Sequence, residues 1–434
     1  MSMIAVGTTG LIAFIVLILL RTPIALAMAL VGLLGGAYVN GWPITLFVTG
    51  SLPFNSVFPY SLSVVPLFVL MGALALHTGM SRNLYDAGYA AFGHWRGGLS
   101  VATIAACAGF GAICGSSLAT SATMGRISIP EMRDRGYDAA FSGATVAAGG
   151  TLGVLIPPSI ILVIYAILTE QSIGQLFIAA IIPGLMATGL YVIAVSVVAR
   201  VAPQLAKSGP KHSAGARLRM VVSAWPVMLV FGLVLGGMFA GLFSPTEAAS
   251  IGVLGVALVA LVRGRLTLDT LKQAAFETAS LSGMIFMILV AASTFNYFIE
   301  ATQVTQMLVG WVGGLGLAPW QIILAIIVFY IVLGCLMDSV SMVFLTVPFI
   351  FPIAMDNGFD PVWFGILLLS VVEIGLITPP VGMNLFVVKL HMPDVPLRRL
   401  YLAVLPFLAA DAVRLTLVAS FPILSLFLVN LAFD

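Results

Sequence analysis

Long apolar segments make up most of this chain, and short polar stretches separate them. The segments lie at 3–20, 23–40, 61–79, 99–125, 139–168, 174–199, 222–242, 246–262, 279–299, 319–353, 361–390 and 400–431. A helix needs about 20 apolar residues to cross a bilayer, and about ten to twelve such segments fit here. The pattern therefore predicts an all-helical protein that crosses a membrane many times.

Two of the apolar segments contain a polar, glycine-rich break. Gly111–Thr123 reads GAICGSSLATSAT, and Gly334–Ser341 reads GCLMDSVS. At membrane depth a helix can break only where the freed backbone is buried in protein or lines a wet cavity. We therefore predict two re-entrant helical hairpins, at 99–125 and 319–353, whose tips are binding sites.

Two other segments carry a proline pair, and each follows one of the breaks. Leu155–Ser159 reads LIPPS within 139–168, and Ile377–Val381 reads ITPPV within 361–390. Proline removes a backbone donor and clashes with the preceding helical turn. Each segment is therefore predicted to form two half-helices with an unwound middle.

The two halves of the chain share motifs at a constant offset in residue number. The matches are Thr22-Pro23 with Ser244-Pro245, Ile129-Pro130 with Phe351-Pro352, Gly136-Tyr137-Asp138 with Gly358-Phe359-Asp360, Gly143 with Gly365, Gly153 with Gly375, and Pro157-Pro158 with Pro379-Pro380. Interrupted apolar segments at corresponding positions of two halves point to a transporter's binding site. We predict an inverted repeat of residues 1–200 and 222–434, joined by a cytoplasmic linker at 201–221.

The basic residues support the inversion. Each half is predicted to cross the membrane five times, because a re-entrant hairpin adds no crossing. An odd number of crossings gives the second half the opposite orientation to the first. With the linker in the cytoplasm, the positive-inside rule is met by all 18 basic residues except Arg414. The loops without basic residues, at 41–60, near Glu170, near Glu300 and at 356–360, then lie outside, as do both termini.

Composition agrees with a membrane protein. The chain is 61% apolar and 8% charged, against about 25% charged residues in soluble proteins. Its formal net charge is +2. The basic residues are scattered through short loops, so they form no surface for nucleic acid. The first apolar run, Ile4–Leu20, lacks a basic start and a small-residue cleavage site, so we expect no cleaved signal.

Catalytic and resident metal sites are not indicated. The cysteines, Cys107, Cys114 and Cys335, lie in apolar stretches and fit neither a disulfide framework nor a metal site. The histidines, His77, His94, His212 and His391, are expected near span ends or in loops, away from both breaks. No zinc-protease, CxxC, nucleophile-elbow or phosphate-loop motif occurs. We expect no enzyme, no cofactor and no ATP site, so an ion gradient or another subunit must drive transport.

At the first tip, the candidate ligands are Gly115, Ser116, Ser117 and Thr120. Hydroxyls and carbonyls at a broken helix suit sodium, and the amides that begin the second half-helix favour an anion. One tip can therefore offer carbonyls to a cation and amides to a carboxylate. The alternative is close packing of small residues between membrane helices.

At the second tip, Asp338, Ser339 and Ser341 hold the matching positions. A carboxylate at membrane depth is expensive, so Asp338 is expected to bind the ion or to carry a proton. The alternative is a helix cap, because Asp accepts from exposed amides at a helix start.

The proline loops add further candidates: Gly153, Pro157, Pro158 and Ser159 near the first tip, and Thr378, Pro379, Pro380, Gly382, Met383 and Asn384 near the second. Glu373, six residues before the second proline pair, either lines the same cavity or is a buried, hydrogen-bonded carboxyl. Asp411 and Arg414 project from one helix face. They are interpreted as a structural ion pair facing another helix, with a gating or substrate role as the alternative.

Four stretches together resemble the large membrane subunit of TRAP transporters, the tripartite ATP-independent periplasmic systems. They are GAICGSSLATSAT at Gly111–Thr123, LIPPS at Leu155–Ser159, SPTEAA at Ser244–Ala249 and TPPVGMN at Thr378–Asn384. The resemblance covers nearly the whole chain. It implies import of a carboxylate or other organic anion by sodium symport across a bacterial inner membrane, with both termini periplasmic.

The resemblance also implies partners and a mechanism. The partners would be a small four-helix membrane subunit, to which this chain is not expected to be fused, and a periplasmic binding protein that delivers the substrate. The mechanism would be an elevator, in which a transport domain with both hairpins slides past a scaffold containing 3–40 and 222–262.

Carried over by position, the first sodium site would use Gly115, Ser116, Ser117 and Pro157-Pro158, and the second would use Asp338, Thr378, Gly382 and Met383. The substrate carboxylate would lie between the tips, near Ser116, Thr120, Ser159, Ser339, Ser341 and Asn384. The alternatives are a channel or pump subunit that translocates ions without an organic substrate, and a symporter of similar fold that needs no binding protein. C4-dicarboxylates, sialic acid, sugar acids and keto acids all stay open as substrates.

Overall fold

The computed structural model describes residues 2–209 and 214–433, so Lys211 and His212 of the predicted linker lie outside the described residues. Within these ranges the chain is helical and forms no strand. The first half contains α1 (Met3–Leu19), α2 (Ile24–Asn40), α3 (Trp42–Val57), η1 (Tyr60–Ser63), α4 (Val64–His77), α5 (Met80–Phe92), α6 (Gly98–Cys114), α7 (Ser117–Asp134), α8 (Ala139–Leu155), α9 (Ile160–Thr169) and α10 (Ile173–Val201).

After α11 (Ala214–Val222), most of which lies in the predicted linker, come the helices of the second half. They are α12 (Trp225–Phe239), α13 (Pro245–Val262), α14 (Leu268–Thr302), α15 (Val304–Gly314), α16 (Pro319–Gly334), α17 (Ser339–Asp356), α18 (Pro361–Gly375), α19 (Met383–Lys389), α20 (Leu397–Ser420) and α21 (Ile423–Phe433). The offset that relates the sequence motifs also relates the start of α7 to that of α17, and the start of α8 to that of α18.

The length and composition of the helices make this a multi-pass membrane protein. Six helical stretches are long and apolar enough to span a bilayer: Tyr60–His77, α10, α13, α14, α17 and α20. The pair α8 and α9, bent by 42° at the first proline loop, makes a seventh if it counts as one span. Other apolar helices are shorter, and both hairpins and both proline segments are interrupted as predicted.

Two helices form the buried centre, and each leads into a proline loop. In α8 every residue from Ala140 to Leu155 is buried, and in α18 every residue from Val362 to Gly375 is buried. Each crosses a hairpin limb at a pair of glycines. A Cβ on Gly334 of α16 would lie 2.8 Å from the Cα of Gly375. A Cβ on Gly111 of α6 would collide with Gly153 of α8. Only glycine allows the backbones this approach.

Several predicted boundaries were wrong. The stretch 41–60, expected to be a loop, contains α3, because Pro43 occupies the first turn, where its missing amide costs nothing. The segment expected at 279–299 belongs to the 35-residue α14, and Thr267 caps its start. Charged residues in the first turns of α14 lowered the hydropathy there. The last segment divides at Phe421 and Pro422 into α20 and α21.

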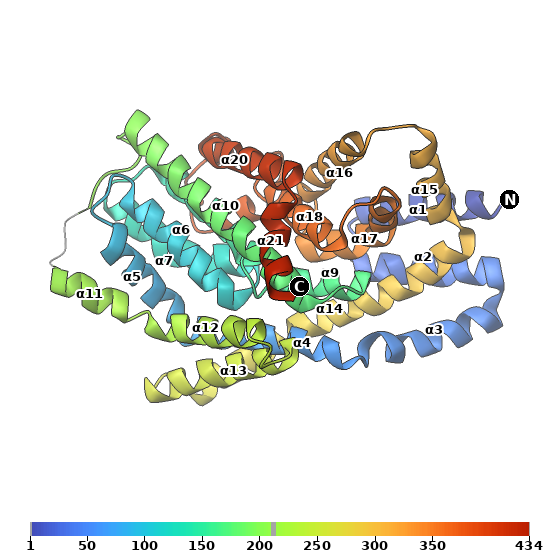
Figure 1. Ribbon diagram of the computed structural model, residues 1–434, viewed down its shortest axis with the longest axis horizontal. Helices are drawn as coiled ribbons and strands as arrows, with labels where there is room; N and C mark the ends of the chain where they lie inside the picture. The colour runs from blue at the N-terminus through green and yellow to red at the C-terminus, as the bar shows by residue number, and fades with distance from the viewer. Residues whose placement is uncertain (1, 210–213, 434) are drawn as a thin grey trace.

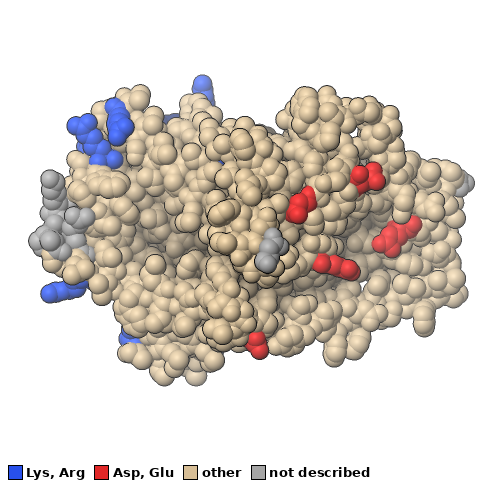
Figure 2. Space-filling model, in the orientation of Figure 1, with Lys and Arg blue, Asp and Glu red and all other residues tan. Residues whose placement is uncertain are grey.

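The arrangement brings distant parts of the chain together. Figure 1 shows α6 and α7 side by side, with α10 nearby, and α14 running along α2 through the molecule. Helix α14 packs on α2, α3 and α4 and also touches α17, so it lies between the first helices of the chain and the second hairpin. Figure 2 shows Lys and Arg gathered at one end of the face drawn, with Asp and Glu towards the middle and the other end.

Candidate functional site

The first break lies between α6 and α7, as predicted. Gly115 ends α6 with a φ of +64°, a conformation that favours glycine. Ser116 caps α7 by accepting from the amide of Ala119 at 3.4 Å. The tip rests on the first proline loop, because a Cβ on Gly115 would lie 3.0 Å from the carbonyl oxygen of Pro158. Tip and proline loop are therefore in direct contact.

The second break, between α16 and α17, has a matching design. Asp338 caps α17 by accepting from the amide of Ser341 at 3.1 Å, so the helix cap considered as an alternative is present. The amide of Gly382 donates to the carbonyl of Cys335 at 3.4 Å. The Cys335 sulfur also lies 3.4 Å from the carbonyl oxygen of Pro379. This tip is thus joined to the second proline loop.

The proline loops interrupt α8–α9 and α18–α19, and both proline pairs have a cis peptide bond. Ser159 caps α9 and is fully buried. In the second loop the Thr378 hydroxyl donates to the carbonyl of Ile374 at 2.7 Å, which leaves oxygen lone pairs that can accept or coordinate. The Tyr401 hydroxyl of α20 donates to the carbonyl of Pro380.

One side chain connects the two tips. The Oε1 atom of Glu373, on α18, accepts from the Ser117 hydroxyl at 3.4 Å and from the Ser339 hydroxyl at 3.1 Å. Glu373 is fully buried. It is therefore the buried, hydrogen-bonded carboxyl considered from the sequence, and it lies where the two tips meet.

The tips share a cavity of about 250 Å³. It is lined by Val69, Gly115, Ser116, Ser117, Leu118, Ala119, Val154, Ile160, Ile161, Glu277, Leu281, Met284, Ile285, Asp338, Ser339 and Val340. The starts of α7 and α17 both reach this cavity, so two helix N-termini meet the carboxyl groups of Glu277 and Asp338. Helix N-termini favour anions and carboxylates favour cations. The cavity can therefore hold an anion and a cation together.

The structure divides the predicted site residues into two groups. Gly115, Ser116, Ser117, Asp338 and Ser339 line the shared cavity. Those that do not line it are Thr120, Pro157, Ser159, Ser341, Thr378, Gly382, Met383 and Asn384. Asn384 donates from Nδ2 to the carbonyl of Ala147 at 3.2 Å, so its side chain contacts α8.

The position of Glu277 at the cavity, and its contact with His77, were not predicted. Glu277 of α14 lines the cavity, and its Oε2 atom lies 2.9 Å from Nε2 of His77. His77 ends α4, as expected; it does not line the cavity and is connected to it only through Glu277. Neither residue belongs to a local pattern with a break, and only the packing of α14 on α4 brings them to the tips.

Asp411 and Arg414 form the structural ion pair interpreted from their spacing. Their side chains are 1% and 0% exposed, and an Arg414 nitrogen lies 2.9 Å from Asp411 Oδ1. The pair faces two other helices: Arg414 donates to the carbonyl of Ser370 on α18, and Tyr191 of α10 donates to Asp411. It connects α20 to the buried centre and does not line the cavity between the tips.

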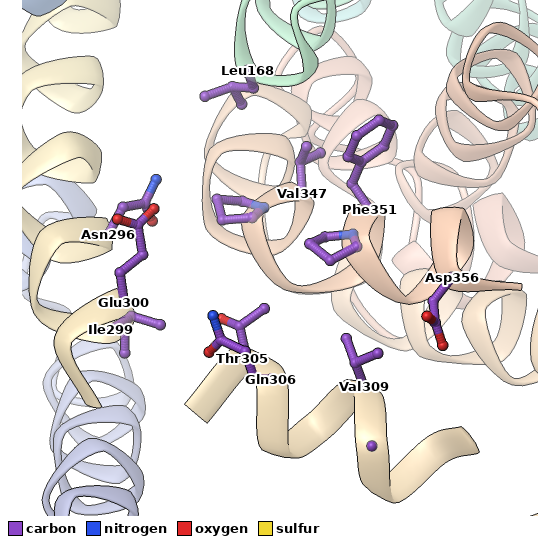
Figure 3. Close-up of a pocket in the computed structure, with 13 residues that line it drawn as sticks. Leu168, Asn296, Ile299, Glu300, Thr305, Gln306, Val309, Val347, Phe351 and Asp356 are labelled. Atoms are coloured by element: carbon purple, nitrogen blue, oxygen red, sulfur yellow. The ribbon is translucent and has the colours of Figure 1, made fainter. Parts of the chain in front are cut away.

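A second hollow of about 650 Å³ lies between the end of α14, helix α15 and the second hairpin limb, α17. In Figure 3, Asn296 and Glu300 project from one side, and Val347 and Phe351 lie on the other. Asp356 lies at the end of α17 and also lines the hollow. Among the described residues, the hollow is lined by two carboxyl groups and by no basic residue.

Comparison with known proteins decides the family. Residues 11–424 match the family described as "Tripartite ATP-independent periplasmic transporter, DctM component". The chain belongs to this family. The large permease protein DctM of a C4-dicarboxylate TRAP transporter from Pseudomonas aeruginosa is 39% identical to this permease over 372 residues, which cover 86% of each chain.

A relative with another substrate is similar over the same extent. The large permease protein SiaM of a sialic acid TRAP transporter from Vibrio cholerae is 32% identical over 373 residues, covering 86% of this permease and 87% of the relative. The relatives are transporter permeases, and this chain is accordingly a transport protein and not an enzyme.

The fold is similar to that of a solved transporter. The YdaH transporter of Alcanivorax borkumensis, whose crystal structure is described as having an unusual topology, aligns with a TM-score of 0.63. The alignment covers 87% of this permease and 88% of YdaH, at 17% sequence identity. The likeness therefore concerns the helical fold alone.

Proposed function

We propose that this permease imports an organic anion by sodium symport. The observation that carries the proposal is the meeting of the two tips at one cavity, which two helix starts and two carboxyl groups line. A cavity of about 250 Å³ is far larger than the roughly 30 Å³ that a water molecule occupies in the liquid. That volume favours an organic substrate with its ions over a channel for ions alone.

The two sodium sites of the proposal lie where each tip joins its proline loop. Gly115, Ser116, Ser117 and the Pro157-Pro158 loop would hold one ion, and Asp338, Thr378, Gly382 and Met383 the other. The contacts of Gly115 with Pro158, and of Cys335 with Pro379 and Gly382, support this pairing of tip and loop. Each loop leaves backbone carbonyls outside a helix, and such carbonyls suit a sodium ion.

The substrate carboxylate would lie between the tips, against the amides that begin α7 and α17. Ser116 and Ser339 line the cavity at these helix starts and would contact it. Thr120, Ser159, Ser341 and Asn384 lie outside the cavity lining, so in this proposal they support the tips and loops.

An elevator mechanism would use α14 as its track. The tips face Glu277, Leu281 and Ile285, whereas the outer hollow begins at Asn296 on the same helix. At 1.5 Å per residue, Glu277 and Asn296 are separated by about 28 Å along the axis. A transport domain that carried the tips along α14 would bring them towards the hollow. Matched helix orders in the two halves support the inverted repeat that such a movement uses.

The proposed partners are a small membrane subunit and a periplasmic binding protein, as in tripartite systems. The positive-inside rule would place the basic end of the molecule in the cytoplasm of a bacterial inner membrane, with both termini periplasmic. The proposed cargo is a carboxylate such as a C4-dicarboxylate, sialic acid or a sugar acid.

Reconstitution tests the proposal. The permease and its small subunit are placed in proteoliposomes, and a binding protein loaded with an organic acid found by thermal-shift screening is added outside. We expect accumulation that requires an inward sodium gradient and no ATP. If no acid that the binding protein takes up accumulates, while sodium still flows through the permease, the permease is instead an ion channel or pump subunit. Uptake without the binding protein would establish an independent symporter.

A further inference from the structure

The carboxyl group of Glu373 is only half satisfied by its surroundings. Its Oε1 atom accepts from the hydroxyls of Ser117 and Ser339, one from each tip. Its Oε2 atom is buried and has no hydrogen-bond partner among the described residues. A buried polar atom without a partner is costly. The position of Oε2 therefore favours a ligand at this point.

Basic side chains do not fill that role within the described part of the chain. No ion pair includes Glu373 within 4.0 Å there. Arg414 lies on the neighbouring α20 and forms no ion pair with Glu373; its Nη2 atom contacts Asp411 at 2.9 Å and the carbonyl of Ser370 at 3.3 Å. A buried carboxyl group either takes up a proton or, in its charged form, needs a counter-charge beside it.

Two further buried oxygens, on helices that pack on α8 as α18 does, also lack partners among the described residues. They are the hydroxyl of Ser121 on α7 and Oδ1 of Asn384 on α19. Both border the same part of α8, since Asn384 donates to the carbonyl of Ala147 and a Cβ on Gly150 would collide with the Ser121 hydroxyl. Helices α7, α18 and α19 all pack on α8, and each carries one of these three buried oxygens without a partner among the described residues.

We propose that Glu373 binds an additional monovalent cation, which bridges the two tips and is distinct from the ions at the two proline loops. Glu373 Oε2 carries the charge that holds the cation. The hydroxyls of Ser117 and Ser339 donate to Oε1 and keep oxygen lone pairs for the same cation. Oxygen donors of this kind suit hard cations, of which sodium is one. The ion would tie the first hairpin to the second before the substrate binds.

The inference rests on the proposed sodium symport, and ion counting separates the two. The purified permease with its small subunit is titrated with NaCl in detergent, without organic substrate, with choline chloride keeping the ionic strength constant. Ions that bind only the folded protein stabilise it, and the rise of stability with the logarithm of sodium concentration is proportional to the number of ions bound. Equilibrium binding of radioactive sodium gives the number of ions per permease directly. Failure of the wild-type protein to bind sodium at all would refute the proposed symport itself.

Glu373→Gln tests the additional ion. The amide oxygen of Gln can still accept from both serine hydroxyls but carries no charge. We expect this variant to bind about one sodium ion fewer than the wild type and to show a correspondingly shallower rise of Tm with sodium concentration. Glu300→Gln, which removes a carboxyl group from the outer hollow, is the matched control and should leave the count unchanged.

Glu373→Asp keeps the negative charge and changes the length of the side chain, so it separates the effect of charge from that of packing. Its carboxylate is one methylene shorter, so we expect the wild-type number of ions with weaker affinity. An unchanged ion count in Glu373→Gln, or equal loss of an ion in Glu373→Gln and Glu373→Asp, would overturn the inference. Should Glu373→Gln not fold, the wild-type count decides: the inference requires one ion more than the two at the proline loops, and a count of two overturns it.

Discussion

The two tips follow one plan but differ in burial and charge. At the first, Pro157, Pro158 and Ser159 are all buried, and a neutral serine, Ser116, caps the helix that follows. At the second, Thr378 and Pro379 are half-buried and Pro380 is exposed. Its helix cap is the carboxyl group of Asp338. The first loop is thus enclosed by protein, whereas the second can be reached from outside the protein.

The ends of the hairpins away from the tips also differ, and again the first hairpin has more contacts with the rest of the protein. The end of α7 is tied to the second half of the chain by Arg133 and Asp394, 2.7 Å apart, and Asp138, just beyond it, pairs with Arg399 at 2.6 Å. Within the described residues, the end of α17 at Asp356 makes no ion pair. The first hairpin is therefore the more firmly held, and the second has fewer restraints on its movement.

This difference gives the two proposed sodium sites different properties. A site enclosed by packing is formed before its ion arrives, so binding loses little free energy to ordering. In the proposed symport, the carboxyl cap at the open tip would supply the negative charge that attracts the ion. Four experiments test this difference between the two tips.

The largest effect is expected at the helix caps. Asp338→Ala removes the charge at the open tip and should lower sodium affinity about 100-fold, because losing a hydrogen-bonded charge contact costs about 2–3 kcal/mol. Ser116→Ala removes only a neutral oxygen and should lower sodium affinity about fivefold, the effect of a lost neutral contact of about 1 kcal/mol. Sodium titration of Tm in the purified permease measures both.

Asp338→Asn is the control for the variants Asp338→Ala and Ser116→Ala. Asn caps helices as well as Asp does, so this variant keeps the start of α17 and loses only the charge. We expect its sodium affinity to match Asp338→Ala and its stability without sodium to match the wild type. If Asp338→Asn bound sodium normally, the cap and not the charge would be the important feature.

The next effect concerns the glycine crossings beneath the tips. Gly111→Ala would push α6 from α8, and Gly334→Ala would push α16 from α18. Overpacking of this kind costs about 1–3 kcal/mol. We expect the larger loss of Tm at Gly111, because α6 is the more buried limb.

Gly310→Ala serves as the control for the crossings. It lies in α15 with nothing within 4 Å of an added Cβ, and an alanine there should stabilise the helix slightly. Equal losses at Gly111 and Gly334 would contradict the view that the first hairpin is the more tightly packed.

The accessibility of the two loops can be compared with single cysteines. In a variant without the native cysteines, Ser159→Cys and Thr378→Cys place a thiol in each proline loop. Labelling by a water-soluble maleimide should be at least about tenfold slower at 159, because exposing that position requires local opening of about 1.4 kcal/mol or more. Equal rates would show that the first loop is as open as the second.

The smallest effect is expected at the surface anchor of the first hairpin. Arg133 donates two hydrogen bonds to Asp394 and holds the pKa of that carboxyl below its usual range. A lowered folded pKa adds stability above the ordinary aspartate pKa of about 3.9, and this stability is lost as the pH falls through the folded value. Because the pair is exposed, Asp394→Asn should change Tm only slightly at neutral pH. A large shift there would mean that the anchor matters more than its exposure implies.

Local chemistry allowed much of the site to be predicted. Ser116 and Asp338 both begin a helix after a break because their short polar side chains accept from free amides, and this tendency needs no tertiary partner. The proline pairs ended α8 and α18 for an equally local reason. The constant offset between the two halves then indicated that the two sets correspond.

The chain's own sequence thus determined that it is a many-helix membrane protein with two broken hairpins, two proline loops and caps at both tips, because these follow from hydrophobic length and from the backbone needs of neighbouring residues. Tertiary structure alone decided that Glu373 joins the tips, that Glu277 and His77 stand beside their cavity, and that one loop is enclosed while the other is open. Those features depend on contacts between helices far apart in sequence, and no spacing along the chain encodes which side chains such packing brings together.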